Sequence, residues 1–342
     1  PGLPLLPFAL IGGSFAYMAR QIQGKQKTAE VRERQELEKI QQAPPPEKIE
    51  SLLKVDLLGL EIGYSLIPLV DQNQGGTLLT RIKAMRRQLA LEMGLIVPPV
   101  RIRDNLQLGS REYAVLIKGV PVVKGEVLPN QFLAINPGNV TQPLKGMKTR
   151  EPAFGLEAWW VGEQDREQAQ FLGYTLVDPA TVITTHVTEV IKAHAHEILG
   201  RQETQHLLDN LGKTYPRLVE DLVPGTLSLG QVQKVLQNLL RERVSIFDLR
   251  TILECLADYG PSTKDTGQLT EFCRQALGRG LIRPYLTGGN DLPVLVLGGA
   301  LEQDLNRKIQ ILGDQPQLVI QPDEAQRLIE AIRRGVDKAG LK

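Results

Sequence analysis

The sequence predicts an α/β multidomain protein, with mixed α/β subdomains and one mainly helical subdomain. The end of a transmembrane helix and a linker precede them. Three observations support this fold class. The chain has 342 residues, enough for two or more domains. Strand-like and helical segments alternate from residue 51 to residue 199 and again after Tyr285, which is typical of α/β folds. Residues 200–280, by contrast, have helical patterns with capping residues at two helix starts.

The N-terminal part is predicted to be a transmembrane helix end (residues 1–19) followed by a linker (residues 20–50). Residues 1–19 contain no charged side chain, and a helix needs roughly 20 apolar residues to span a bilayer. Basic residues follow from Arg20 to Arg34, so the positive-inside rule places the rest of the chain in the cytoplasm. The linker is charged and Pro-rich, a composition that cannot bury enough apolar surface to fold alone. A buried globular helix is the alternative for residues 1–19.

Residues 51–128 and 178–199 are predicted to form the first α/β subdomain. Apolar residues from Leu78 to Met93 repeat at helical spacing with basic residues opposite, which predicts an amphipathic helix. A second helix is expected over Thr181–Leu199. The predicted strands are Leu60–Val70, Val100–Arg103 and Tyr113–Val123.

Residues 129–177 are turn-rich and are predicted to be an inserted second subdomain. A proline and a glycine bracket Phe154, so its ring is expected on a bend near the surface, where a docking pocket needs it. The alternative is that Phe154 plugs its own small domain, because buried aromatic rings usually serve packing. The chain's two tryptophans, Trp159 and Trp160, alternate along a predicted strand, so at least one should fill the core of this domain.

Residues 200–280 are predicted to be the helical third subdomain. Ser228 with Gln231, and Ser245 with Asp248, provide capping-box chemistry at the start of two helices. A DNA-binding helix-turn-helix is a poor alternative, because the second helix presents mainly acidic side chains where a recognition helix needs basic and amide groups. The balance of 40 basic and 39 acidic residues also argues against nucleic acid as a partner.

Residues 281–342 are predicted to be a fourth α/β subdomain. It is expected to be truncated, because the chain stops after a helix with no following strand. Its predicted elements are a strand over Val294–Leu297, a helix from Leu301, a strand over Leu318–Ile320 and a helix from Asp323.

The sequence contains no recognisable set of catalytic, cofactor or metal-binding residues. Gly212-Lys213-Thr214 ends like a phosphate loop, but Leu207 occupies the position of the required glycine and no strand precedes it. His194 and His196 are two residues apart on a predicted helix and therefore point to different faces. We expect no enzyme activity, no cofactor and no metal.

Seven short motifs occur between Leu58 and Leu240, and their order and spacing are specific as a set. They are Leu58–Tyr64, Ile67–Asp71, Val100–Asp104, Leu133–Gly138, Pro152–Leu156, Glu220–Gly225 and Lys234–Leu240. Together they resemble the cytoplasmic region of the export-gate family of type III secretion systems. The Pro-Ala-Phe-Gly-Leu motif resembles the flagellar branch of this family more than the branch of virulence injection systems.

This resemblance implies a position in the bacterial inner membrane, with a multi-span membrane domain before this region and attachment through residues 1–19. It further implies four cytoplasmic subdomains and a nonameric ring beneath the secretion pore. The implied partners are export chaperones that carry late flagellar subunits, together with other export-apparatus subunits. A virulence export-gate homologue and a purely structural ring scaffold stay open as alternatives.

The resemblance also implies a chaperone-docking dimple in the second subdomain, beside the first. The matching and lining residues are Glu151, Phe154, Thr185, Ile135 and Pro137. Glu151, where the family often has aspartate, is expected to orient the partner through a polar contact. Gly59 matches a glycine tied to subdomain movement, which makes it a candidate hinge because glycine tolerates unusual dihedral angles.

Overall fold

The structure is a computed structural model that describes residues 55–138, 140, 142, 144–286, 291, 292, 294–312 and 315–339. The predicted membrane-helix end and linker therefore lie outside the described residues. The chain divides into the compact units Pro1–Val55 and Asp56–Lys342, and the fold described below belongs to the second. None of the helices in the described ranges has both the length and the apolar character that crossing a membrane requires.

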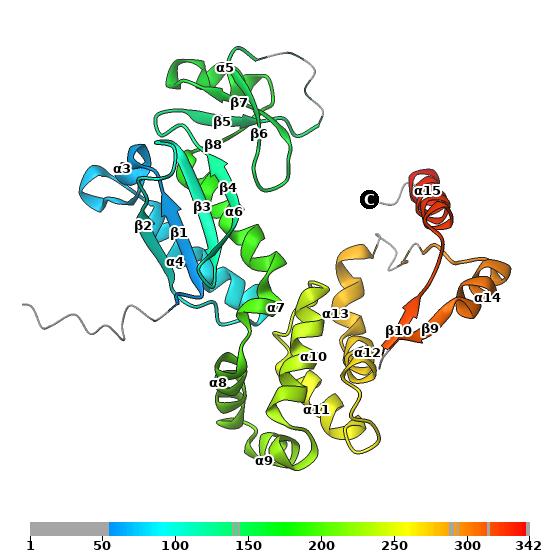
Figure 1. Cartoon of the computed structure of the whole chain (residues 1–342). Helices are drawn as coiled ribbons and strands as arrows, with labels where there is room; N and C mark the ends of the chain where they lie inside the picture. The colour runs from blue at the N-terminus through cyan, green and yellow to red at the C-terminus, as the bar shows by residue number, and fades with distance from the viewer. Residues whose placement is uncertain are drawn as a thin grey trace, which may run out of the picture. The chain divides into compact units, whose positions relative to one another are not determined.

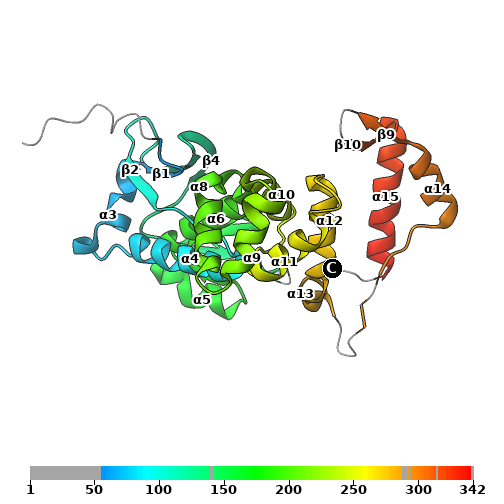
Figure 2. The same ribbon diagram turned by 90° about the horizontal axis from the view of Figure 1, so that it is seen from below.

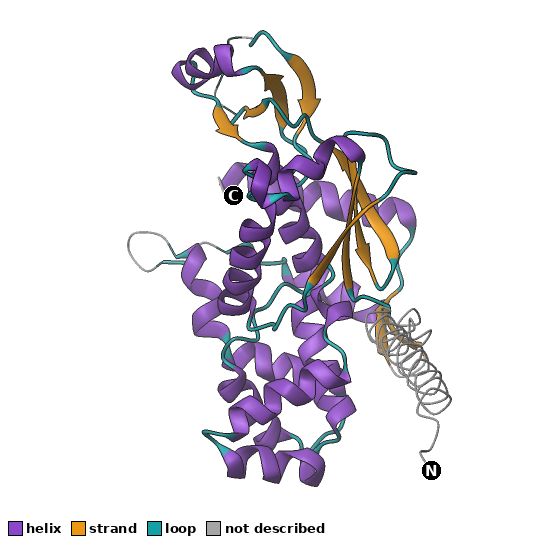
Figure 3. Ribbon diagram, turned by 90° about the vertical axis from the view of Figure 1, so that its left-hand side faces the viewer, coloured by secondary structure: helices purple, strands orange, loops and turns teal. Residues whose placement is uncertain are grey.

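Four strands of the first subdomain form a sheet in the order β2-β1-β3-β4 (Figure 1). They are β1 (Leu58–Ile62), β2 (Val100–Asp104), β3 (Glu112–Ile117) and β4 (Val120–Glu126). Strand β1 pairs with β2 in parallel and with β3 in antiparallel orientation. Helices α4 (Leu78–Met93) and α6 (Pro179–Ala193) lie on one face of this sheet, and their apolar stripes share its core (Figure 3). The predicted amphipathic helix is confirmed as α4.

The predicted strand Leu60–Val70 is wrong beyond Ile62. The chain instead forms a 3₁₀ turn (Tyr64–Leu66) and a short helix α3 (Ile67–Val70), followed by a second 3₁₀ turn (Gln72–Gln74). Proline is tolerated in the first turn of a helix, where Pro68 stands, because that turn's N–H groups have no partner within the helix. The apolar side chains here pack on the core from a helical turn, so an apolar run of this length did not distinguish strand from helix.

All strands of the second sheet lie within the predicted insertion. They are β5 (Phe132–Ile135), β6 (Met147–Arg150), β7 (Glu157–Val161) and β8 (Thr175–Val177), and helix α5 (Arg166–Phe171) follows a 3₁₀ turn (Glu163–Asp165). The strands form an antiparallel sheet in the order β6-β7-β5-β8. Trp160 faces the large core that includes α6, whereas Trp159 packs in the insertion's own small core, edge-on to Tyr174 at 5.5 Å. The expectation that at least one tryptophan fills a core is therefore confirmed.

The third subdomain consists of helices, as predicted (Figure 2). They are α7 (Ala195–Ile198), α8 (Arg201–Gly212), α9 (Pro216–Glu220), α10 (Leu229–Arg241), α11 (Leu249–Tyr259), α12 (Thr266–Ala276) and α13 (Gly278–Ile282), with a π-turn (Asp221–Thr226) and a 3₁₀ turn (Arg283–Tyr285). The capping box of Ser228 and Gln231 at the start of α10 is confirmed.

The second predicted capping pair is wrong. Asp248 itself caps α11, since its side chain accepts a hydrogen bond from Thr251 N at 3.1 Å. Ser245 instead donates its hydroxyl to Glu92 O at 2.7 Å, at the end of α4. The loop before α11 is therefore bound to the first subdomain, a contact that local sequence rules do not include.

In the fourth subdomain, α14 (Gly299–Arg307), β9 (Ile309–Leu312), β10 (Gln315–Leu318) and α15 (Pro322–Ala339) follow one another, and the two strands pair. Both predicted helices are confirmed, but β10 ends where the second predicted strand begins, and β9 was not predicted. Val294–Leu297 is not a strand: its side chains are exposed, and it pairs with no strand in the described part of the chain. A β-branched run becomes a strand only where a partner strand is available.

Gly94, at the end of α4, should be much less tolerant of substitution than Gly75. Both have left-handed backbone, with φ of +72° and +80°. A Cβ at Gly94 would lie 2.3 Å from Phe247 N, whereas a Cβ at Gly75 would meet nothing within 4 Å. We expect Gly75→Ala to lower the free energy of unfolding by about 1–2 kcal/mol, from backbone strain alone. Gly94→Ala should cost about 3 kcal/mol or more, because the α11 loop must also move.

Urea unfolding of the two variants measures this difference. Equal losses of stability would show that the close approach of the Phe247 backbone to Gly94 contributes nothing beyond the left-handed backbone.

Candidate functional site

The loop between β6 and β7 presents Phe154 to solvent. Phe154 is 60% exposed and its neighbour Leu156 is 44% exposed. Gly155 between them has φ of +70°, which turns the backbone sharply. The alternative that Phe154 plugs its own domain is therefore wrong: the loop exposes an apolar pair on its outer side.

Glu151 shapes this loop from inside. Its side chain is only 3% exposed, and its two carboxylate oxygens accept hydrogen bonds from Ala153 N at 2.8 Å and Phe154 N at 2.6 Å. Its backbone also bonds to the loop, since Glu151 N donates to Leu156 O and Gly155 N donates to Glu151 O. Hydrogen bonds to a carboxylate are stronger than those between neutral groups. Glu151 was expected to make a polar contact with a partner. This expectation does not fit its buried side chain, whose two carboxylate oxygens both accept hydrogen bonds from the loop.

Ile135 and Pro137 lie beside this loop, at the same end of the second sheet. Ile135 pairs with Ala158 on β7, and Asn136 N donates to Glu157 O at 2.9 Å. Ile135 is half-buried against the large core, whereas Pro137 is exposed just beyond the strand. The pairing of β5 with β7 thus brings both predicted lining residues to the base of the Phe154 loop.

Thr185 lies on α6, half-buried, next to His186. Burial lowers the pKa of His186, and the negative charge of Glu151 opposes this effect in part. Strand β5, whose Ile135 lies at the base of the Phe154 loop, contacts α6, the helix that carries Thr185. The structure therefore brings segments from both α/β subdomains together at the candidate site.

Tyr113 and His186 form a buried pair that the sequence analysis missed. The hydroxyl of Tyr113 lies 2.8 Å from Nδ1 of His186, and the two rings meet edge to face. Burial raises the pKa of Tyr113 well above its usual range, and Glu151 adds to this effect. One signal was available: His186 stands in helical register with the apolar residues Ile183 and Val190, which predicts an inward-facing side chain.

Gly59 was predicted to be a hinge because glycine tolerates unusual dihedral angles. The structure does not support this reason. This glycine lies inside β1, an interior strand, and pairs with Arg101 on one side and Leu116 on the other. Its backbone is extended, so it uses no conformation that other residues avoid. A Cβ at Gly59 would lie 3.3 Å from Cβ of Leu116, so glycine here permits close contact with β3.

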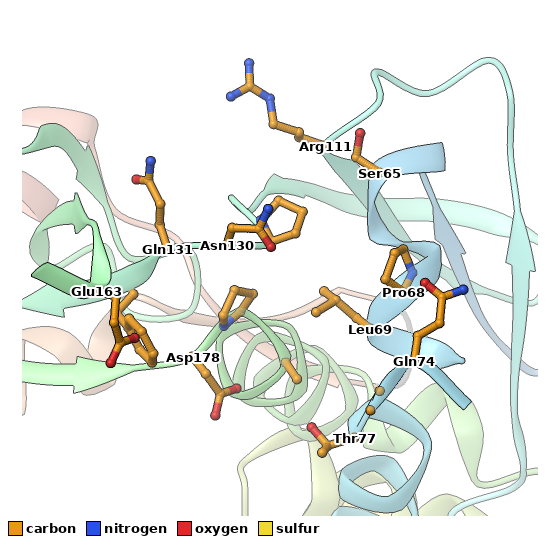
Figure 4. A pocket seen from close by; sticks show the side chains of 16 residues that line it. Ser65, Pro68, Leu69, Gln74, Thr77, Arg111, Asn130, Gln131, Glu163 and Asp178 are labelled. Atoms are coloured by element: carbon orange, nitrogen blue, oxygen red, sulfur yellow. The ribbon is translucent and has the colours of Figure 1, made fainter. Parts of the chain in front are cut away.

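A cavity of about 680 Å³ lies where the chain enters and leaves the insertion (Figure 4). Asn130 and Gln131 line it from the entering segment, and Asp178 lines it from the leaving segment. The leaving segment is held by Arg81, whose Nη2 lies 2.7 Å from Asp178 Oδ2 and whose Nη1 donates to Thr181. These two segments are the covalent links between the insertion and the first subdomain.

Comparison with known proteins places the chain in a family. Residues 1–342 match the model of the FHIPEP family. "Flagellar biosynthesis protein FlhA" of Bacillus subtilis (strain 168) is 44% identical over 319 residues, which are 93% of this chain and 47% of that protein. The chain therefore spans about half the length of the curated relatives that it matches.

Solved structures share the fold. "Structure of the Chlamydia pneumoniae CdsV protein" superposes with a TM-score of 0.72 at 25% identity, over 82% of this chain and 83% of that one. "Cryo-EM structure of nonameric EPEC SctV-C" has a TM-score of 0.66 at 22% identity, with the same coverage. The predicted mixed α/β multidomain class is confirmed. The match along the whole chain shows that it belongs to the FHIPEP family.

Proposed function

We propose that this region is the cytoplasmic part of a flagellar type III protein export gate. It forms a ring under the export pore and, without enzymatic activity, docks complexes of chaperones with flagellar subunits for ordered secretion. The observation that supports docking most directly is the exposed Phe154 on a loop whose backbone Glu151 holds. The name of the Bacillus subtilis relative supports the flagellar setting, and the nonameric structure with the same fold supports a ring.

Docking on the Phe154 loop is physically reasonable because the loop is ordered before a partner arrives. Binding costs less entropy when the contact residues already have their bound conformation. An exposed aromatic ring beside a second apolar side chain, here Leu156, is typical of residues that dominate binding energy. A chaperone must also be released during export, so we expect moderate affinity from this small apolar contact.

We propose further that membrane-spanning segments anchor the whole protein in the bacterial inner membrane, with other export-apparatus subunits as neighbours. The main alternative setting is the export gate of a virulence injection system. The 44% identity to a protein named for flagellar biosynthesis favours the flagellar setting.

Replacing Phe154 with alanine tests the docking site. We expect the affinity for a purified flagellar chaperone–subunit complex to fall roughly 30-fold, or about 2 kcal/mol, as for other central aromatic contacts. The fold should persist because the ring is largely exposed. Phe171→Ala is the matched control: this ring is 91% exposed on α5 of the same subdomain and should not affect binding. Calorimetry that gives equal affinities for wild type and Phe154→Ala would contradict the assignment.

The purely structural ring scaffold makes a different prediction for the same variant. If the Phe154 loop packs against neighbouring subunits, Phe154→Ala should reduce the oligomer mass measured by light scattering and leave chaperone binding to the monomer unchanged. A docking role instead predicts unchanged oligomer mass and weaker chaperone binding.

Glu151→Gln should weaken docking indirectly. Glutamine keeps one acceptor oxygen but places an NH₂ group against the second backbone N–H, so one of the two loop bonds is lost. We expect an affinity loss of roughly three- to tenfold, corresponding to about one hydrogen bond. Glu163→Gln is the control, because this exposed carboxylate pairs with Arg166 in a different turn. Titration calorimetry that shows the same small effect for both variants would remove Glu151 from the site.

A further inference from the structure

Glu151 and His186, the buried acid and the buried imidazole of the described residues, interact electrostatically with each other. In the described part of the chain, four polar side chains are buried: Glu151, His186, Thr204 and Thr270. The two threonines donate their hydroxyls to carbonyl groups one turn earlier in the chain, Gly200 O and Thr266 O, which accounts for their burial. The acid and the imidazole are more costly to bury, so their proximity needs a separate explanation.

Tyr113 connects these groups to the first sheet. It is fully buried on β3, with its hydroxyl 2.8 Å from Nδ1 of His186 on α6. Gly125 on β4 provides the space, because a Cβ there would lie 2.5 Å from the Tyr113 hydroxyl oxygen. Two strands and a helix of the first subdomain therefore hold this pair in place.

Glu151 reaches the same cluster from the inserted subdomain. Its charge acts on both Tyr113 and His186, while its two oxygens bind the N–H groups of Ala153 and Phe154. A neutral tyrosine and a neutral imidazole carry no positive charge that would attract the Glu151 carboxylate away from the loop. The loop N–H groups then keep both oxygens.

We propose that Tyr113 and His186 are positioning residues of the docking surface, which loosens when His186 takes up a proton. This inference rests on the proposed docking function of Phe154. A protonated His186 attracts the Glu151 carboxylate and competes with the two loop N–H groups for it. Its Nδ1 also becomes a donor, so the Tyr113 hydroxyl can only accept from it. Both changes weaken the interactions that hold the loop that presents Phe154.

The direction of the pH effect follows from the surroundings of His186. His186 is hydrogen-bonded to Tyr113 from β3, and the charge of Glu151 from the β6–β7 loop acts on it. Burial lowers the pKa of His186 below its ordinary value of 6.5, and Glu151 opposes this only in part. At neutral pH the folded chain therefore holds His186 neutral. As the pH falls below 6.5, the unfolded state takes up the proton first, so the contribution of this site to stability is lost.

Amide hydrogen exchange in the full free chain tests the positioning without any partner. Protection factors of the Ala153 and Phe154 amides are measured at about pH 7.5 and about pH 5, the lower value set well below an ordinary histidine pKa because burial lowers the pKa of His186. Tyr113→Phe should lower this protection roughly three- to tenfold at neutral pH, the effect of about one buried hydrogen bond. His186→Asn keeps a hydrogen-bonding group near Nδ1 but cannot titrate, so protection should persist and its pH dependence should vanish.

Two variants control for general effects. Tyr174→Phe removes a tyrosine hydroxyl that bonds to Gln142 O elsewhere in the insertion, and it should leave the protection of Ala153 and Phe154 unchanged. His194→Asn removes a histidine that pairs with Glu197, and it should leave the pH dependence of the loop unchanged.

Binding of a purified flagellar chaperone–subunit complex, measured at the same two pH values, then connects the loop to docking. Wild-type affinity should fall roughly three- to tenfold at the lower pH, and His186→Asn should abolish most of this fall. Loop protection that is independent of pH and unchanged by Tyr113→Phe would overturn the inference. If protection changes as expected but Phe154→Ala leaves binding intact, the positioning is supported and the docking function is overturned.

Discussion

The buried carboxylate of Glu151 is the interaction on which the candidate docking surface depends. A buried carboxylate is costly unless hydrogen bonds compensate it, and here the compensation comes from the N–H groups of Ala153 and Phe154. The same two bonds determine the shape of the turn. Burial of the acid and exposure of the Phe154 ring are therefore consequences of one arrangement, and neither can change alone.

The position of this loop is in turn set by packing between the two α/β subdomains. The inner face of the inserted sheet, with Leu133 and Trp160, belongs to the same core as Ile183 on α6. Close-packed interiors transmit small displacements, so the orientation of α6 and that of the insertion are coupled. Asn130 and Gln131 on the entering segment and Asp178 on the leaving segment line a cavity, whereas Gly59 is held inside a paired sheet.

Features that depend on local chemistry were predictable from the sequence. The amphipathic helix α4, the capping box of Ser228 and the bend at Phe154 each follow from residues within a few positions of one another. One error was local, since the apolar run after Ile62 fits a strand and a helical turn equally well, and two others occurred where a partner distant in sequence decides the outcome. Val294–Leu297 has strand composition without a partner strand in the described residues, and Ser245 bonds to α4 instead of capping its own helix.

The sequence by itself determined the family, through the order of its motifs. The proline and glycine that flank Phe154 left docking and packing both open, and the resemblance to the family then indicated docking. Only the tertiary structure decided that Glu151 turns inward to hold its own loop and that Tyr113 meets His186. Those two residues are 73 positions apart and come from a strand and a helix. Local sequence patterns indicate the secondary-structure propensity of a segment and the period of its apolar residues. The pairing of polar groups distant in sequence is instead set by how a sheet and a helix pack into one core.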